Sequence, residues 1–229
     1  MLEDTLLGLI VKNADEIPDE VAIREKRYGV WSPMTWTQFR DNVQRFALGL
    51  RALGFETGDN LAIIGDNKPE WIIAEFGCMA AGGLPTGAYP DGMAEEMEYL
   101  ISYSDARFLV VRDQEQVDKI LAIWERIRDQ VSKVIVWDSR GMSHYYGEYS
   151  FLERFEKVLH LGVEEEKGQK DYLLKLVEKI DPAQPAMMLT TSGTTAKPKL
   201  SLLSHENFIE ASKSYGEVVE MRRGDELLS

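Results

Sequence analysis

Residues 55–82 read FETGDNLAIIGDNKPEWIIAEFGCMAAG, and this stretch decides the fold class. Gly58 and Asp59 mark a turn, and the short apolar run Leu61–Ile64 that follows is typical of a buried strand. Pro69 then suits the first turn of a helix, because its ring presets φ and its missing N–H needs no partner there. The stretch therefore predicts a buried strand followed by a crossover helix.

The same alternation of short apolar runs and longer segments extends in both directions. Apolar residues at helical spacing predict helices over 3–13 and 35–54, and Gly54 is well placed to close the second helix. The pattern continues through GLPTGAY with helices over 94–102 and 114–129 and strands over 107–111, 133–137 and 186–191. Short apolar strands separated by helices indicate an α/β fold with a mostly parallel, helix-covered sheet.

Residues 140–185 interrupt this alternation. Gly and Tyr punctuate the start, an amphipathic segment follows, and DPAQP at 181–185 breaks the chain. We interpret the segment as a variable, lid-like or linking excursion rather than a separate domain. Its acidic run at 164–166 is interpreted as a solvated helix face rather than a metal site, which is the usual fate of such runs. His144 and His160 lack metal-like spacing and are assigned to the surface.

Composition sets the class of protein. The 229 residues are 44% apolar and 28% charged, as in an ordinary globular protein, and the net charge of −13 argues against nucleic-acid binding. No apolar run reaches about 18 residues, and Glu3 and Asp4 stand where a secretory signal needs positive charge. We therefore expect a cytoplasmic protein. The single cysteine, Cys78, is expected to be a small buried hydrophobic residue.

A hydroxyl-rich segment follows the predicted strand 186–191. Residues 192–199 read SGTTAKPK, and the apolar run after them looks like a second strand. Backbone N–H groups, hydroxyls and a lysine together suit the oxygens of a polyphosphate. The segment is not a Walker motif, because no Gly-Lys-Ser/Thr closes it and a strand rather than a helix follows. On composition alone, a polar hairpin turn is the favoured interpretation, because clusters of Ser, Thr and Gly usually form such turns.

The longer stretch TTSGTTAKPKLSLLSHENF at 190–208 resembles the phosphate-binding signature of the adenylate-forming superfamily, which includes acyl-CoA synthetases, luciferases and peptide-synthetase adenylation domains. Upstream segments, among them TWTQF at 35–39 and EEMEYLISYSDARFLVV at 95–111, resemble the opening segments of that family. Asn67–Trp71 is most like the long-chain fatty acid–CoA ligases, and Trp71 itself is assigned to the core. The resemblance covers the chain from about residue 20 onward, and is weakest between 140 and 180.

The resemblance implies a phosphate loop over 190–200. Thr191, Ser192, Gly193, Thr194 and Thr195 would surround the β- and γ-phosphates of ATP, and Lys199 would supply charge near them. The family commonly has Gly where this chain has Ala196 and Leu200. His205 is a candidate pocket-lining residue, although Ser204 as a helix N-cap with Asn207 three positions later gives His205 an equally good structural role.

The implied reaction uses ATP with Mg²⁺ to join a fatty acid to coenzyme A. Association with a membrane surface would suit a fatty acid substrate. Residues 1–229 would form a partial N-terminal AMP-binding domain, the C-terminal domain being absent. The family's catalytic lysine and acidic magnesium ligand would lie downstream, so we expect no catalytic residue, no metal ligand and no ligase turnover in this chain alone. A non-catalytic nucleotide-binding relic or sensor and an amino-acid-activating adenylation domain are the alternatives. The sequence indicates no oligomeric state.

Overall fold

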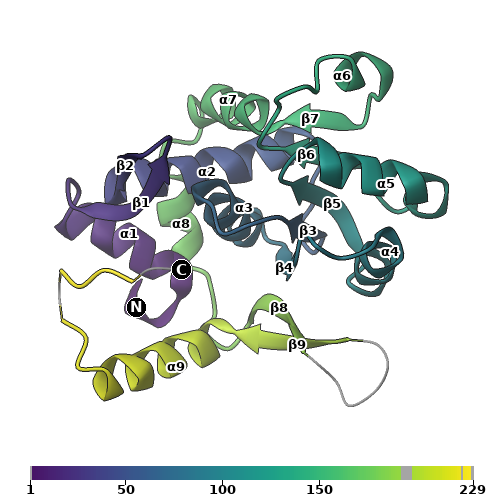
Figure 1. The fold of residues 1–229 in the computed structure, drawn as a ribbon. Helices are drawn as coiled ribbons and strands as arrows, with labels where there is room; N and C mark the ends of the chain where they lie inside the picture. The colour runs from purple at the N-terminus through teal and green to yellow at the C-terminus, as the bar shows by residue number, and fades with distance from the viewer. Residues whose placement is uncertain (1, 192–197, 223, 228–229) are drawn as a thin grey trace.

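The computed structural model describes residues 2–191, 198–222 and 224–227 (Figure 1). Its main sheet contains β3 (Asn60–Ile64), β4 (Leu84–Ala88), β5 (Ala106–Val111), β6 (Lys133–Val136), β7 (Leu152–Arg154), β8 (Pro185–Thr191) and β9 (Lys199–Ser204). The strand order is β7-β6-β5-β3-β4-β8-β9. Neighbouring strands run parallel except β8 and β9, which are antiparallel. The predicted fold class, an α/β fold with a mostly parallel sheet, is confirmed.

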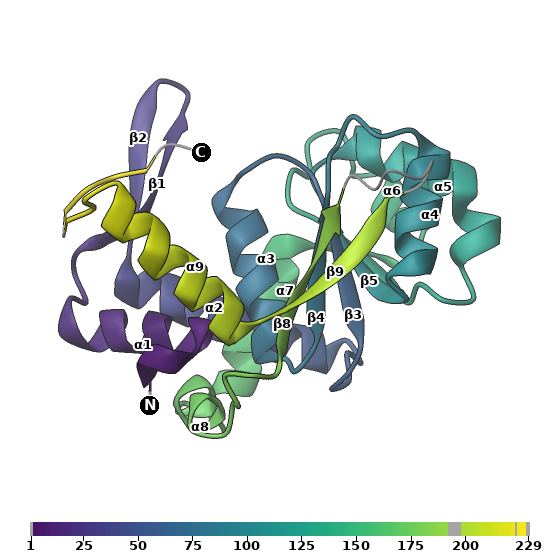
Figure 2. The same ribbon diagram turned by 90° about the horizontal axis from the view of Figure 1, so that it is seen from below.

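Helices cover both faces of this sheet (Figure 2). One face carries α2 (Trp36–Ala52), α3 (Pro69–Ala80) and α7 (Phe155–Glu166), and the other carries α4 (Ala94–Tyr103) and α5 (Gln114–Ile127). Side chains of β3 alternate between the two: Leu61 and Ile63 join the core under α3, whereas Ala62 and Ile64 join the core under α4 and α5. Because both faces are buried, the strand reads as one continuous apolar run.

Local sequence signals set the predicted helix boundaries. Pro69 occupies the first turn of α3, and Thr35 and Gln38 form a reciprocal capping box at the start of α2. Cys78 is fully buried in α3, as expected for a small hydrophobic residue, and burial raises the pKa of its thiol. Trp71 is partly buried against the core.

A hairpin formed by β1 (Val21–Arg27) and β2 (Val30–Thr35) was not predicted from the sequence. Its turn residues Tyr28 and Gly29 both have positive φ, 49° and 83°, which suits the twist of a two-residue hairpin turn. Most hairpin side chains are exposed or partly buried, so the strands lack the apolar alternation that would reveal them. The hairpin projects from the body near α1 (Leu6–Glu16), which follows a short 3-10 turn at Leu2–Asp4 (Figure 2).

Residues 140–185, interpreted from the sequence as a lid-like or linking excursion rather than a separate domain, form helices and a strand that pack on the main body. This segment contains α6 (Tyr145–Glu148), β7, α7 and α8 (Tyr172–Val177), and β7 extends the main sheet beside β6. Phe155 of α7 stacks on Phe46 of α2 with ring centroids 4.7 Å apart. Glu166 accepts hydrogen bonds from Gln44 and Arg45 of α2, so only the rest of the acidic run faces solvent. The segment therefore belongs to the core. His144 and His160 are exposed, as predicted.

A glycine contact between α7 and α2 tests this assignment. A Cβ placed on Gly162 would lie 1.8 Å from the carbonyl oxygen of Arg45. Gly162→Ala should therefore lower the free energy of unfolding by about 1–3 kcal/mol, despite the better helix propensity of alanine. Urea denaturation measures this change. Gly147→Ala is the control, because a Cβ there meets nothing within 4 Å. Equal stability of the two variants would contradict a close α2–α7 contact.

Candidate nucleotide-phosphate site

The β8–β9 hairpin carries the two ends of the predicted phosphate loop. β8 runs parallel to β4 through the pairing of Met188 with Thr86, so Thr191 ends β8 at the edge where β4 also ends. Thr191 pairs with Lys199, the first residue of β9. The two predicted strands that flank residues 192–197 are confirmed, and β8 ends at the carboxyl edge of the sheet, where open α/β sheets bind their ligands.

A cavity of about 740 Å³ lies between α4 and this hairpin. Aromatic and apolar side chains from the end of β4 and from α4 form one wall, and residues of β8 and β9 form the other. The lining residues are Ala88, Tyr89, Gly92, Glu95, Glu96, Met97, Tyr99, Leu100, Tyr103, Thr190, Thr191, Pro198, Lys199 and Leu200. Figure 1 and Figure 2 both place the end of the hairpin where β8 stops and β9 starts on the same side of the molecule as α4.

Two side-chain hydroxyls contact the backbone where β9 begins. Thr191 Oγ1 donates to the carbonyl oxygen of Lys199 at 3.3 Å, and the Tyr99 hydroxyl donates to the carbonyl oxygen of Pro198 at 2.9 Å. Lys199 is exposed, and its ammonium group forms no ion pair with any residue that the structure describes. It is also the one cation among the described residues lining the cavity. Its charge is thus available to an anion.

Two of the predicted site residues lie together in the structure, and four others are not among the described residues. Thr191 and Lys199 are neighbours at the cavity, and Leu200 lines the cavity from β9. Ser192, Gly193, Thr194 and Thr195 lie outside the described residues, as does Ala196.

His205 lies away from the cavity, at the start of α9 (His205–Val218). It is 2% exposed, and its Nδ1 accepts a hydrogen bond from the backbone N–H of Leu6 at 3.3 Å. Ser204 and Asn207 form a capping box, which confirms the predicted helix start. The structural role proposed for His205 therefore accounts for its environment, and the ring joins α9 to the start of α1.

Burial lowers the pKa of His205 from its ordinary value of 6.5, which predicts a pH dependence of stability. A lowered folded-state pKa means that the unfolded chain binds the proton more readily than the folded chain. The stability contributed by buried, neutral His205 is therefore complete above about pH 7 and is lost as pH falls. His205→Gln should therefore lose less unfolding free energy than the unsubstituted chain between pH 7.5 and 5. Urea titrations at several pH values measure this, and His160→Gln, at an exposed position, should follow the unsubstituted chain. Parallel profiles for all three would refute the burial effect.

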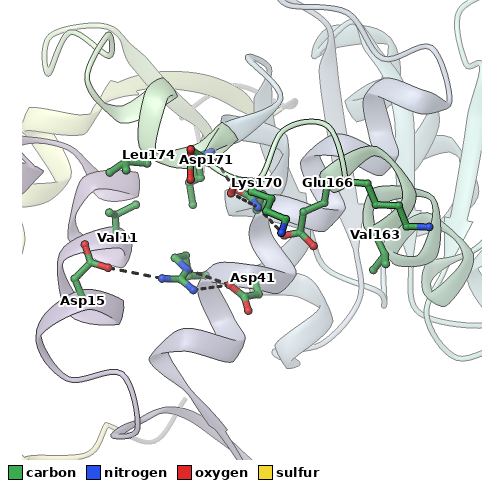
Figure 3. A pocket seen from close by; sticks show the side chains of 12 residues that line it. Val11, Asp15, Asp41, Val163, Glu166, Lys170, Asp171 and Leu174 are labelled. Carbon is green, nitrogen blue, oxygen red and sulfur yellow. Dashed lines mark hydrogen bonds and ion pairs between the residues drawn. The ribbon is translucent and has the colours of Figure 1, made fainter.

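A second hollow of about 480 Å³ lies among α1, α2, α7 and α8 (Figure 3). Its polar groups bind one another: Arg40 pairs with Asp41 at 2.8 Å, and Gln44 donates to Glu166 at 2.7 Å. The Arg40–Asp41 pair lies within α2, whereas the Arg40–Asp15 contact at 3.7 Å joins α2 to α1 and the Gln44–Glu166 bond joins α2 to α7. We interpret this hollow as a joint between helices and assign it no ligand.

Sequence reasoning missed the tyrosines of the cavity. Tyr99 and Tyr103 are one helical turn apart on α4, and their rings stack with centroids 5.4 Å apart. Tyr89 follows β4 and is 83% exposed. The spacing of Tyr99 and Tyr103 signals a shared helix face. The contact of Tyr99 with Pro198, however, spans 99 positions in the chain and has no local signal.

The fold is an α/β domain with a cavity at the carboxyl edge of its mostly parallel sheet. The chain belongs to the AMP-binding enzyme family, whose sequence profile matches residues 10–229. The architecture, a mixed α/β fold with a mostly parallel sheet, is that of the N-terminal domains of adenylate-forming enzymes.

Similar curated proteins include long-chain-fatty-acid–CoA ligases. The chain is 31% identical over 187 residues to heimdall of Drosophila melanogaster, a match covering 80% of this chain and 26% of that protein. It is 28% identical over 223 residues to ACSBG2 of Xenopus laevis, covering 97% of this chain and 29% of that protein. The chain therefore spans less than a third of the length of these relatives.

Solved structures share the fold. MbtA of Mycobacterium smegmatis superimposes with a TM-score of 0.72 at 22% identity, covering 96% of this chain and 37% of MbtA. The fatty acyl-adenylate ligase of L. pneumophila, solved with acyl adenylate and pyrophosphate, gives 0.69 at 16% identity, covering 96% of this chain and 33% of that protein. At these identities the likeness concerns the fold alone. Among the described residues, the helices are all too short or too polar to cross a bilayer.

Proposed function

We propose that this chain supplies the triphosphate-binding part of an ATP-dependent fatty acid–coenzyme A ligase. In the first step, a carboxylate oxygen attacks the α-phosphorus of ATP, giving an acyl-adenylate and releasing pyrophosphate. In the second, the thiol of coenzyme A attacks the acyl carbon and AMP leaves. The observation that carries the proposal is the position of Thr191 and Lys199, which stand together at the carboxyl edge beside a cavity.

The residues at this edge suit an anion. Lys199 has no ionic partner among the described residues, and Thr191 adds a hydroxyl beside it. Hydrogen bonds to a charged phosphate contribute about 1.5–3 kcal/mol each, so a few local contacts can hold ATP on a chain of net charge −13. From the sequence, Ser192–Thr195 complete the proposed grip on the β- and γ-phosphates, with Gly193 permitting a close backbone approach.

In this proposal Mg²⁺ receives no ligand from the described part of this chain, and the acidic ligand that the resemblance implies would lie downstream. The described part of the chain contains no group of three or more His, Cys, Asp or Glu residues arranged to hold a metal ion. The phosphate oxygens of ATP would instead bind Mg²⁺, which would neutralise charge on the leaving pyrophosphate. What this chain contributes is the placement of the Lys199 charge and the Thr191 hydroxyl.

The choice of a fatty acid rests on the relatives. The two curated proteins described above are named as long-chain-fatty-acid–CoA ligases, and the matches cover 80% and 97% of this chain. Because they cover less than a third of each relative, the proposed ligase activity is that of a protein carrying the remaining segments as well.

Lys199→Ala tests the phosphate site in such a longer protein. Losing the ammonium group should lower ATP–pyrophosphate exchange by at least about tenfold at subsaturating ATP, because one charge-assisted hydrogen bond is lost. Lys213→Ala is the control, since Lys213 is exposed on α9 and pairs only locally, with Glu210 at 2.8 Å. An exchange rate in Lys199→Ala equal to that of the control would remove Lys199 from the site.

The 229-residue chain by itself should form no acyl-CoA, because the proposed reaction also needs groups that the longer relatives carry beyond the matched region. Incubation with ATP, Mg²⁺, coenzyme A and a long-chain fatty acid, followed by mass spectrometry of the thioester, measures this. Measurable acyl-CoA from the chain alone would contradict the proposal that the reaction also needs segments carried by the longer relatives.

A further inference from the structure

Two successive backbone carbonyls at the start of β9 each accept a side-chain hydroxyl. The carbonyl of Pro198 accepts from Tyr99, at 2.9 Å, and the carbonyl of Lys199 accepts from Thr191, at 3.3 Å. One donor comes from α4 and the other from the facing strand β8. The backbone of Lys199 is therefore held from two sides, by elements that meet only in the folded chain.

These contacts constrain the backbone conformation of Lys199. The Pro198 ring fixes its own φ near −65°, and the bond from Tyr99 then orients the peptide plane between Pro198 and Lys199. The bond from Thr191 orients the following plane, between Lys199 and Leu200. With both flanking planes held, the direction in which the Lys199 side chain leaves the backbone is set.

Tyr99 stands on a well-anchored helix. Met97 and Ile101 of α4 are buried in the core that α4 shares with the sheet and α5. Glu98 on the same helix pairs with Arg126 of α5 at 2.8 Å, and the Tyr99 ring stacks on Tyr103. A donor on such a helix has a fixed position, which is what positioning a charged group requires.

We propose that Tyr99 is a positioning residue for ATP: through the Pro198 carbonyl it orients Lys199 toward the triphosphate. The inference rests on the proposed function, and it names a residue 100 positions before Lys199 that no local motif identifies. Tyr99 need not touch the nucleotide, because it acts through the backbone of β9.

The test compares two tyrosines whose hydroxyls make the same kind of bond. Tyr172 donates to the carbonyl of Ala80 at 2.7 Å, joining α8 to the end of α3, and it lies outside the residues lining the cavity. Tyr99→Phe and Tyr172→Phe therefore both lose a long-range bond from a tyrosine hydroxyl to a backbone carbonyl while keeping the ring. Only the first bond bears on Lys199.

The kinetic arm uses ATP–pyrophosphate exchange by a protein that carries this chain with the remaining segments of its relatives. Tyr99→Phe should raise the KM for ATP by about threefold to tenfold, the effect of one hydrogen bond, and leave the KM for the fatty acid unchanged. Tyr172→Phe should change neither KM. The midpoint of thermal unfolding of each variant shows whether a general loss of stability accompanies the change.

The second arm is independent of ATP and uses the 229-residue chain. Hydrogen exchange of peptides covering 198–204 should be faster in Tyr99→Phe than in the unsubstituted chain, and unchanged in Tyr172→Phe. An unchanged KM for ATP in an active Tyr99→Phe enzyme would overturn the inference and leave the proposed function standing. So would equal rises in the KM values for ATP and fatty acid. Absence of exchange activity in the unsubstituted protein would instead overturn the proposed function itself, and this inference with it.

Discussion

The pairing of β8 with β4 is the constraint on which the candidate site depends. Met188 lies opposite Thr86 in parallel register, and this pairing attaches the β8–β9 hairpin to the sheet. Because parallel strands end at the same edge, Thr191 and Lys199 come to lie beside the end of β4 and the helix that follows it. A register shift of one residue would turn the side chains of β8 to the opposite face of the sheet and move the hairpin away from α4.

The electrostatics of the chain give this placement its importance. A net charge of −13 provides no general attraction for a nucleotide, so an anion must be bound by local groups. At the cavity, Lys199 is the one cation among the described lining residues, while Glu95 and Glu96 stand on the opposite wall. A single lysine in such surroundings binds an anion more tightly when its backbone is held in place. This links the Tyr99 and Thr191 contacts to the proposed chemistry.

Local signals made most of the fold predictable, and long-range contacts account for what was missed. The apolar run at Leu61–Ile64, the proline at 69 and the Ser204 cap each act within a few residues, and the structure confirms all three. The strand β7 has only three residues and was missed, since its pairing with β6 rather than its own pattern defines it. At the site, Thr191 and Lys199 followed from the motif, whereas Tyr99 joins them only through folding.

We propose that the segment between Thr191 and Lys199 holds the triphosphate of ATP. The most direct measurement is an experimental structure of a protein carrying this chain, determined with a non-hydrolysable ATP analogue and Mg²⁺. We predict β- and γ-phosphate oxygens within hydrogen-bonding distance of Lys199 Nζ and of the hydroxyl groups at 191–195. A triphosphate bound elsewhere, with the Lys199 ammonium group and those hydroxyls occupied by the protein's own groups, would contradict the account.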